Sequence, residues 1–257
     1  MTRRLLFVSL DVLLHDRHLF FWREIVQLLA NLFLLTGRGE TAEVYTRFAA
    51  RISADAYRVV VISAADYSAA ETRAEIDELI RSADVVEPRV LLGSDVGARA
   101  ALELVAARTV IVDAVITAGL AIAGTVAIDD RDAEIQARTA CSVHRGVLGR
   151  ATHGTLSTAV GALALSRPAP AGIDVPILAI HGAADVISPL EPAIAFYRNA
   201  GVAEVTVVDG GRHDILNDVT HRSVAAAIVG FLERLRLGAD QTPLLVITRT
   251  SPQPVIT

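Results

Sequence analysis

The chain contains no lysine and a single cysteine. All 24 basic residues are arginines, which excludes a catalytic lysine, and Cys141 alone cannot form an internal disulfide or a cysteine metal cluster. Acidic residues number 29, and the resulting net charge of −5 gives no indication of a nucleic-acid partner. No residue pattern implies a metal or an organic cofactor.

Apolar runs of membrane-spanning length are also missing. The apolar stretch at residues 5–10 follows two arginines, but Asp11 interrupts it and no small-residue cleavage site follows, so a signal peptide is not predicted. We therefore expect a cytoplasmic protein without a membrane span. Its 257 residues, 52% of them hydrophobic and 21% charged, are most simply interpreted as one α/β domain.

Apolar runs rich in Val, Ile and Leu alternate with helical patterns along most of the chain. The predicted strands are residues 31–36, 57–63, 89–92, 109–116, 175–182 and 203–210. The predicted helices include residues 41–53, 69–82, 191–200 and 220–236. Such alternation predicts a mostly parallel central sheet with helices on both faces.

Residues 117–172 interrupt this alternation. They contain Gly, Ala and Thr clusters and two weakly helical runs, near 131–141 and 154–165, and we interpret them as a short helical cap inserted over the sheet. Residues 1–237 then form a single domain, in which two strands near the start (5–14 and 17–26) are favoured over an amphipathic helix at 20–30. Residues 238–257 form a C-terminal tail, with 244–248 as a candidate edge strand.

A sharp turn between a predicted strand and a predicted helix is the most informative motif. Gly93-Ser94-Asp95-Val96-Gly97 follows the strand at 89–92 and precedes an Ala/Leu-rich helical run. This is the pattern of a nucleophile elbow, where flanking glycines let the strand and helix approach closely. The central position, normally serine, is Asp95.

Polar residues also follow the other predicted strands. Thr36-Gly37-Arg38-Gly39 follows the first, Asp185 follows the strand at 175–182, and His213 follows the strand at 203–210. Because functional side chains of open α/β sheets gather at the carboxyl ends of the strands, we expect these residues to lie together. The order nucleophile, acid, histidine is that of an α/β-hydrolase triad.

Three segments resemble the lysophospholipases and monoacylglycerol lipases of the α/β-hydrolase superfamily. They are HGAADVISP (181–189), GGRHDILND (210–218) and LFLLTGRGETAEVYTRFAARIS (32–53). The resemblance covers roughly residues 31–116 and 173–237 and leaves the cap unmatched. It departs from the family at Thr36, where a histidine is usual, and at Asp95.

The resemblance implies an α/β-hydrolase fold and a set of site residues. His213 would be the general base, oriented by the carboxylate of Asp185. The backbone N–H groups of Arg38 and Val96 would form the oxyanion hole, which needs no particular side chain. The elbow glycines would be Gly93 and Gly97, and the candidate substrate contacts are Ser94, Thr36 and Val186.

In having an aspartate at the centre of the elbow, the chain resembles the haloalkane dehalogenases and epoxide hydrolases of this superfamily. A carboxylate, with an ordinary pKa of about 3.9, is ionised near neutral pH and needs no base to activate it. However, Val96 stands where dehalogenases have a tryptophan, and all four tyrosines lie outside residues 117–172, where epoxide hydrolases carry their paired tyrosines. Arg38, Cys141, His144 and His153 are the substitute donors that a cap could bring in.

The sequence therefore predicts a hydrolase acting on a small, mostly apolar substrate (an ester or related compound) with an Asp95-His213-Asp185 triad. One alternative is a catalytically silent α/β-hydrolase scaffold that binds a small ligand or a partner protein. Others are dehalogenase- or epoxide-hydrolase-type alkyl-enzyme chemistry, an esterase in which His213 activates water directly, and a shifted turn with Ser94 as nucleophile. A homodimer is compatible with the sequence, which does not fix the oligomeric state.

Overall fold

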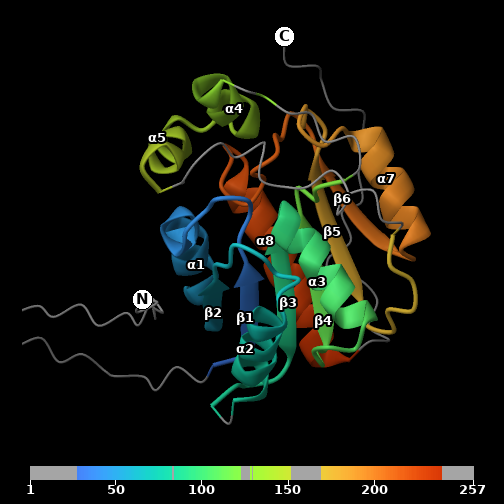
Figure 1. The fold of residues 1–257 in the computed structure, drawn as a ribbon. Coiled ribbons are helices and arrows are strands. Elements are labelled where there is room, and N and C mark those ends of the chain that lie inside the picture. The colour runs from blue at the N-terminus through green and yellow to red at the C-terminus, as the bar shows by residue number, and fades with distance from the viewer. Residues whose placement is uncertain (1–27, 83, 123–127, 129, 152–168, 239–257) are drawn as a thin grey trace, which may run out of the picture.

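The computed structural model of the chain describes residues 28–82, 84–122, 128, 130–151 and 169–238. Within these ranges six strands form one sheet in the order β2-β1-β3-β4-β5-β6 (Figure 1). The strands are β1 (Ala30–Leu35), β2 (Tyr57–Ile62), β3 (Arg89–Ser94), β4 (Ala114–Ala118), β5 (Ile177–Gly182) and β6 (Glu204–Val208). All five neighbouring pairs are parallel, so the predicted fold class is confirmed.

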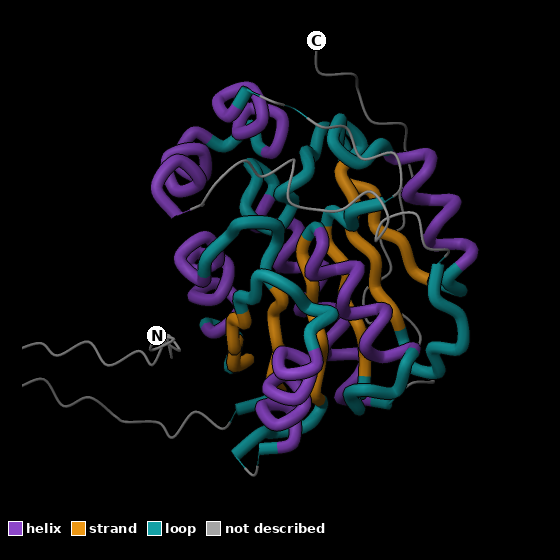
Figure 2. Tube along the Cα trace, in the orientation of Figure 1, coloured by secondary structure: helices purple, strands orange, loops and turns teal. Residues whose placement is uncertain are grey.

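The central strands β1, β4 and β5 are buried on both faces, and their alternate residues point to opposite sides of the sheet. In β1, Leu32 and Leu34 pack in one hydrophobic cluster, while Phe33 and Leu35 pack in another. The first cluster includes side chains of α1 (Thr46–Ser53) and α8 (His221–Leu237). The second includes side chains of α2 (Ala70–Arg81), α3 (Val96–Ala106) and α7 (Leu190–Asn199), so helices flank the sheet on both sides (Figure 2).

The register of the sheet brings several loops to one edge. Leu35 of β1 is paired with Gly93 of β3, and Gly182 of β5 is paired with Val208 of β6. Parallel strands that end at the same level release their following loops at the same edge. The loops after β1, β3, β5 and β6 therefore come together there.

Two further helices, α4 (Arg131–Arg138) and α5 (Ser142–Ala151), lie beyond this edge, near the start of α1 (Figure 1). The side chain of Asp130 accepts a hydrogen bond from the backbone N–H of Ala133 at 2.7 Å and so caps the first turn of α4. Helices α4 and α5 belong to residues 117–172, the stretch for which the sequence predicts a helical cap.

The structure differs from the predicted elements at several places. The predicted helix at 41–53 begins as a 3-10 helix, Ala42–Tyr45, before α1, and helix α5 was not predicted. The fourth strand is Ala114–Ala118 and not residues 109–116, because Val110 and Val112 are buried in a loop without joining the sheet. The predicted helix at 131–141 ends at Arg138, where Thr139 turns the chain into α5. The predicted segments 5–14, 17–26, 154–165 and 244–248 lie outside the described residues.

Candidate active site

Asp95 lies at the junction of β3 and α3 in a strained backbone conformation. Its φ of 53° and ψ of −118° fall in a region that residues other than glycine rarely adopt. A Cβ on Gly93 would lie 2.2 Å from the carbonyl oxygen of Gly97, and one on Gly97 would lie 2.3 Å from that of Leu35. Only glycine at both positions allows the strand, the turn and the helix to pack this closely.

Three of the predicted site residues are brought together at the strand ends. His213 Nε2 lies 3.2 Å from Asp95 Oδ1, and His213 Nδ1 lies 2.8 Å from Asp185 Oδ2. All three side chains are buried. The imidazole thus stands between two carboxylates, one from the elbow and one from the loop after β5.

The Asp185 carboxylate is held by the backbone that follows it. Its Oδ1 accepts hydrogen bonds from the N–H groups of Ile187 at 2.9 Å and Ser188 at 2.8 Å, while Oδ2 contacts His213 and lies 3.4 Å from His181 Nε2. Burial favours the neutral acid, but the charge and hydrogen bond of His213 outweigh it and lower the pKa of Asp185. Such a fixed, ionised carboxylate orients an imidazole ring.

The two oxygens of Asp95 have different surroundings. Oδ2 accepts hydrogen bonds from the backbone N–H of Arg38 at 3.1 Å and from Arg38 Nε at 2.8 Å, and Nη2 of Arg138 lies 3.4 Å away. Oδ1 faces His213. Burial would raise the pKa of Asp95, but Arg38, His213 and Arg138 together hold it well below its usual range.

The surroundings of His213 favour the protonated form of its ring. Burial disfavours the imidazolium, but the charge and hydrogen bond of Asp185 and the nearby charge of Asp95 raise the pKa of His213 to about 10. The arrangement therefore favours an ion-paired state, in which a carboxylate, an imidazolium and a second carboxylate follow one another.

The predicted oxyanion hole lies beside the same carboxylate. Arg38 N–H donates to Asp95 itself, and Val96 is the first residue of α3, where backbone N–H groups lack intrahelical partners. The preceding turn is fixed by the N–H of Gly37, which donates to Glu40 Oε2 at 2.9 Å and to the Tyr45 hydroxyl at 3.1 Å. The Tyr45 hydroxyl also donates to Glu40.

The three residues predicted as substrate contacts have different surroundings. Thr36 is buried and its hydroxyl contacts that of Tyr67 at 3.2 Å, whereas Val186 is 56% exposed. Ser94 lies beside Tyr45 and lines a narrow gap next to the elbow that has no room for a water molecule.

A buried charge network that we did not predict adjoins the triad. Arg138 of α4 lies 3.0 Å from Asp214, 3.6 Å from Glu40 and 3.4 Å from Asp95. His144 of α5, predicted only as a substitute donor, contacts Asp214 at 3.0 Å. Asp214 is the one member of this network that the sequence could have suggested, because it directly follows His213. No neighbouring residue pattern indicates that Arg138 or Glu40 belongs to it.

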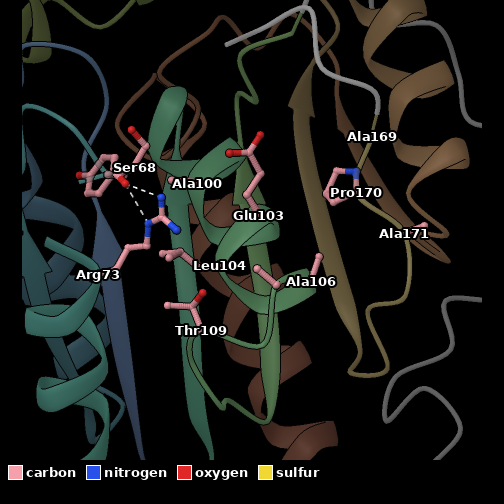
Figure 3. A pocket seen from close by; sticks show the side chains of 12 residues that line it. Ser68, Arg73, Ala100, Glu103, Leu104, Ala106, Thr109, Ala169, Pro170 and Ala171 are labelled. Atoms are coloured by element: carbon pink, nitrogen blue, oxygen red, sulfur yellow. Dashed lines mark hydrogen bonds between the residues drawn. The ribbon is translucent and has the colours of Figure 1, made fainter. Parts of the chain in front are cut away.

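A larger cavity of about 520 Å³ lies between α2, α3 and residues 169–171 (Figure 3). Ala100, Leu104 and Pro170 line it, together with Arg73 and Glu103. Asp95, His213 and Asp185 do not line this cavity, so it is separate from the site that they form.

Among the described residues, no group of three or more His, Cys, Asp and Glu side chains is arranged to hold a metal ion. None of the helices described is both long and apolar enough to cross a membrane.

The fold is similar to solved structures of lipases and esterases. Monoacylglycerol lipase from Paleococcus ferrophilus is 15% identical, with 80% of this chain and 94% of that chain covered and a TM-score of 0.62. Monoglyceride lipase from Saccharomyces cerevisiae, solved as a soluble variant with a substrate analog, is 14% identical (81% and 87% covered, TM-score 0.64). An esterase from Exiguobacterium antarcticum is 17% identical (79% and 92% covered, TM-score 0.59). At these identities the likeness concerns the fold.

No curated protein sequence is significantly similar to this chain. The family described as "Serine aminopeptidase, S33" matches residues 64–220, a range that contains Asp95, Asp185 and His213. Because this match spans more than half of the sequence, the chain belongs to the serine aminopeptidase S33 family of α/β-hydrolases, with an aspartate at the centre of its elbow.

Proposed function

We propose that this chain is a hydrolase for a small, mostly apolar substrate with an ester or related group, and that the Asp95 carboxylate is its nucleophile and attacks a saturated carbon of that substrate. His213 would be the acid and base, and Asp185 would orient it. The observation that supports this most directly is the approach of Asp95 Oδ1 to His213 Nε2 at 3.2 Å, with Asp185 2.8 Å behind the ring. Since the elbow side chain is not serine, the acyl-serine route suggested by the family name does not carry over.

The chemistry of a carboxylate limits which carbon it can attack. At an acyl carbon the tetrahedral intermediate would expel the weaker base, which is the carboxylate itself and not an alkoxide, so the attack would reverse. At a saturated carbon, Asp95 Oδ1 forms an alkyl ester while the bond to the leaving group breaks and the leaving group departs with the electron pair. The lowered pKa of Asp95 keeps the nucleophile ionised. We therefore favour attack at an alkyl carbon.

The raised pKa of His213 suits the first half of this reaction, since the imidazolium can give its proton to the leaving group. Formation of the ester removes the negative charge of Asp95, one of the causes that raise the pKa of His213. The neutral imidazole can then take a proton from a water molecule that attacks Cγ of Asp95. Direct activation of water by His213 in the resting state is less well supported, because the raised pKa of His213 disfavours the neutral ring that would accept a proton from water.

The test uses a panel of esters, epoxides, lactones and haloalkanes. We expect Asp95→Asn and His213→Ala to abolish turnover, while Asp66→Asn, which changes an exposed aspartate, leaves it unchanged. A single turnover in heavy-oxygen water should place one heavy oxygen in the peptide that contains Asp95. An active enzyme with an unlabelled Asp95 would refute the covalent mechanism.

One observation favours a second candidate, the catalytically silent scaffold. The Asp95 carboxylate is 1% exposed and is surrounded by Arg38, Arg138 and His213, an arrangement that also suits a static ion pair. In that case no member of the panel would show turnover that depends on Asp95. Asp95→Ser tests the rest of the site, because a gain of esterase activity would mean that His213 and Asp185 are able to support catalysis.

The epoxide-hydrolase variant receives less support. Each of the four tyrosines makes hydrogen bonds elsewhere: Tyr45 with Glu40, Tyr57 with Glu233, Tyr67 with Thr36, and Tyr197 with His181. A tyrosine that protonates an epoxide oxygen would have to face the carbon that Asp95 attacks.

A further inference from the structure

We propose that the guanidinium of Arg38 is a catalytic group that stabilises the oxyanion formed when the Asp95 ester is hydrolysed. The sequence suggests only its backbone N–H for this role. The inference rests on the proposed function, because it concerns the second half of that reaction. Arg38 would then donate two hydrogen bonds to Asp95 Oδ2, one from its neutral backbone N–H and one from its charged guanidinium.

The geometry that carries the inference is the convergence of these donors on Asp95 Oδ2. The backbone N–H of Arg38 is 3.1 Å from this oxygen and Nε is 2.8 Å from it. Both groups are buried, with Arg38 5% exposed and Asp95 1% exposed. Charge-assisted hydrogen bonds in such a site are stronger than those between neutral groups.

Oδ2 is also the oxygen on which charge develops. If Oδ1, which faces His213, bonds to the substrate, Oδ2 becomes the carbonyl oxygen of the ester. Water then attacks Cγ, its proton passes to His213 Nε2, and the carbonyl electron pair moves onto Oδ2. Collapse of this intermediate breaks the Cγ–Oδ1 bond, and the departing alkoxide takes the proton from His213. The new carboxylic acid returns a proton to His213 and restores the ion pair.

The charge on Oδ2 changes in opposite directions in the two half-reactions. In the attack step the carboxylate loses its negative charge, so Arg38 stabilises the starting state and does not speed the step. In the hydrolysis step a neutral ester gains a negative charge, and a fixed cation next to Oδ2 stabilises the transition state. Removal of the guanidinium should therefore slow hydrolysis of the ester without slowing its formation.

Arg138 is less suited to this role. Its Nη2 is 3.4 Å from Asp95 Oδ2, a longer contact than that of Arg38, and its Nη1 lies 3.0 Å from Asp214. Its charge is thus shared with carboxylates that do not react. We assign it to holding α4 in position.

The test measures formation and hydrolysis of the ester separately. The wild type and Arg38→Met are mixed with the panel substrate that is turned over, quenched at intervals, and analysed by mass spectrometry of the peptide containing Asp95. We expect Arg38→Met to accumulate the ester, with hydrolysis slowed on the order of 100-fold or more, the usual loss when one oxyanion donor is removed. Arg38→Lys, which keeps the charge, should restore part of the rate.

Arg150→Met serves as the matched control, because it makes the same change on an exposed side chain of α5 and should behave as the wild type. Arg38→Gln provides a second neutral variant if Arg38→Met does not fold. Equal loss of both rates, or an unchanged rate of ester hydrolysis in an Asp95-labelled enzyme, would overturn the inference alone. An active enzyme in which Asp95 is never labelled would overturn the proposed function, and this inference with it.

Discussion

The ion pair between Asp95 and His213 predicts a large change in the pKa of His213 when the elbow carboxylate is neutralised. The two groups are 3.2 Å apart, and unit charges at that separation attract by about 5 kcal/mol at an effective dielectric constant of about 20. About 1.4 kcal/mol corresponds to one pKa unit, so the full attraction is equivalent to about four units. The nearer carboxylate of Asp185 remains in Asp95→Asn, and we expect the pKa of His213 to fall by at least about two units.

The assay is a titration of the imidazole ring by NMR. The chain has seven histidines, and the signal missing from His213→Gln identifies the ring of His213. In the wild type this signal should stay that of an imidazolium from pH 5 to 9, because its pKa is about 10. In Asp95→Asn it should change within that range, whereas Asp66→Asn should leave it as in the wild type.

Two results would refute the electrostatic reasoning. One is a wild-type His213 that titrates at its ordinary pKa of about 6.5. The other is a shift of less than one unit in Asp95→Asn, which would mean that Asp185 alone accounts for the protonated ring. Neither result depends on having found a substrate, so this test applies equally to an active enzyme and to a silent scaffold.

Three further predictions concern stability. Since the folded pKa of His213, about 10, exceeds its unfolded value of 6.5, the folded protein keeps a proton that the unfolded chain releases. The free energy of unfolding should therefore decrease by on the order of 5 kcal/mol as the pH rises through this interval. Urea unfolding at several pH values measures this dependence, and His213→Gln should make it flatter. A free energy of unfolding that increases with pH would contradict the prediction. Gly97→Ala should destabilise the folded protein by about 3 kcal/mol or more, because its Cβ would lie 2.3 Å from a backbone oxygen. Gly149→Ala in α5 is the control: its Cβ would meet no atom within 4 Å, and it should stabilise the protein by about 0.5–1 kcal/mol. Thermal unfolding of both variants measures the difference. Leu91→Ala removes most of a fully buried side chain of β3 and should lower the free energy of unfolding in urea by about 2–5 kcal/mol. A loss below about 1 kcal/mol would mean that neighbouring side chains move in to fill the cavity.

The parts of the fold that the sequence predicts are those with a local signal. The elbow is recognisable because Gly93 and Gly97 are spaced symmetrically about Asp95, between an apolar strand and a helical run. Asp185 and His213 are recognisable because they follow apolar strands, whose carboxyl ends meet at one edge of a parallel sheet. In each case a short stretch of chain contains the whole pattern.

The buried charge network has no such signal. Arg138 and Asp214 are 76 residues apart, and Arg38 and Asp95 are 57 apart, so their contacts exist only once the sheet has formed. A charged residue in a helical pattern ordinarily predicts a solvent-facing position. The boundaries of β4 were wrong for a related reason, because Val110 and Val112 are apolar and buried but lie in a loop.

Arg138 ties one helix to the loops after three different strands. Its guanidinium contacts Glu40 after β1, Asp95 after β3 and Asp214 after β6. Separation of α4 from the sheet would leave buried carboxylates at all three loops without this partner, which is costly. Helix α4 and the three loops should consequently open and close together, as one cooperative unit in amide hydrogen exchange.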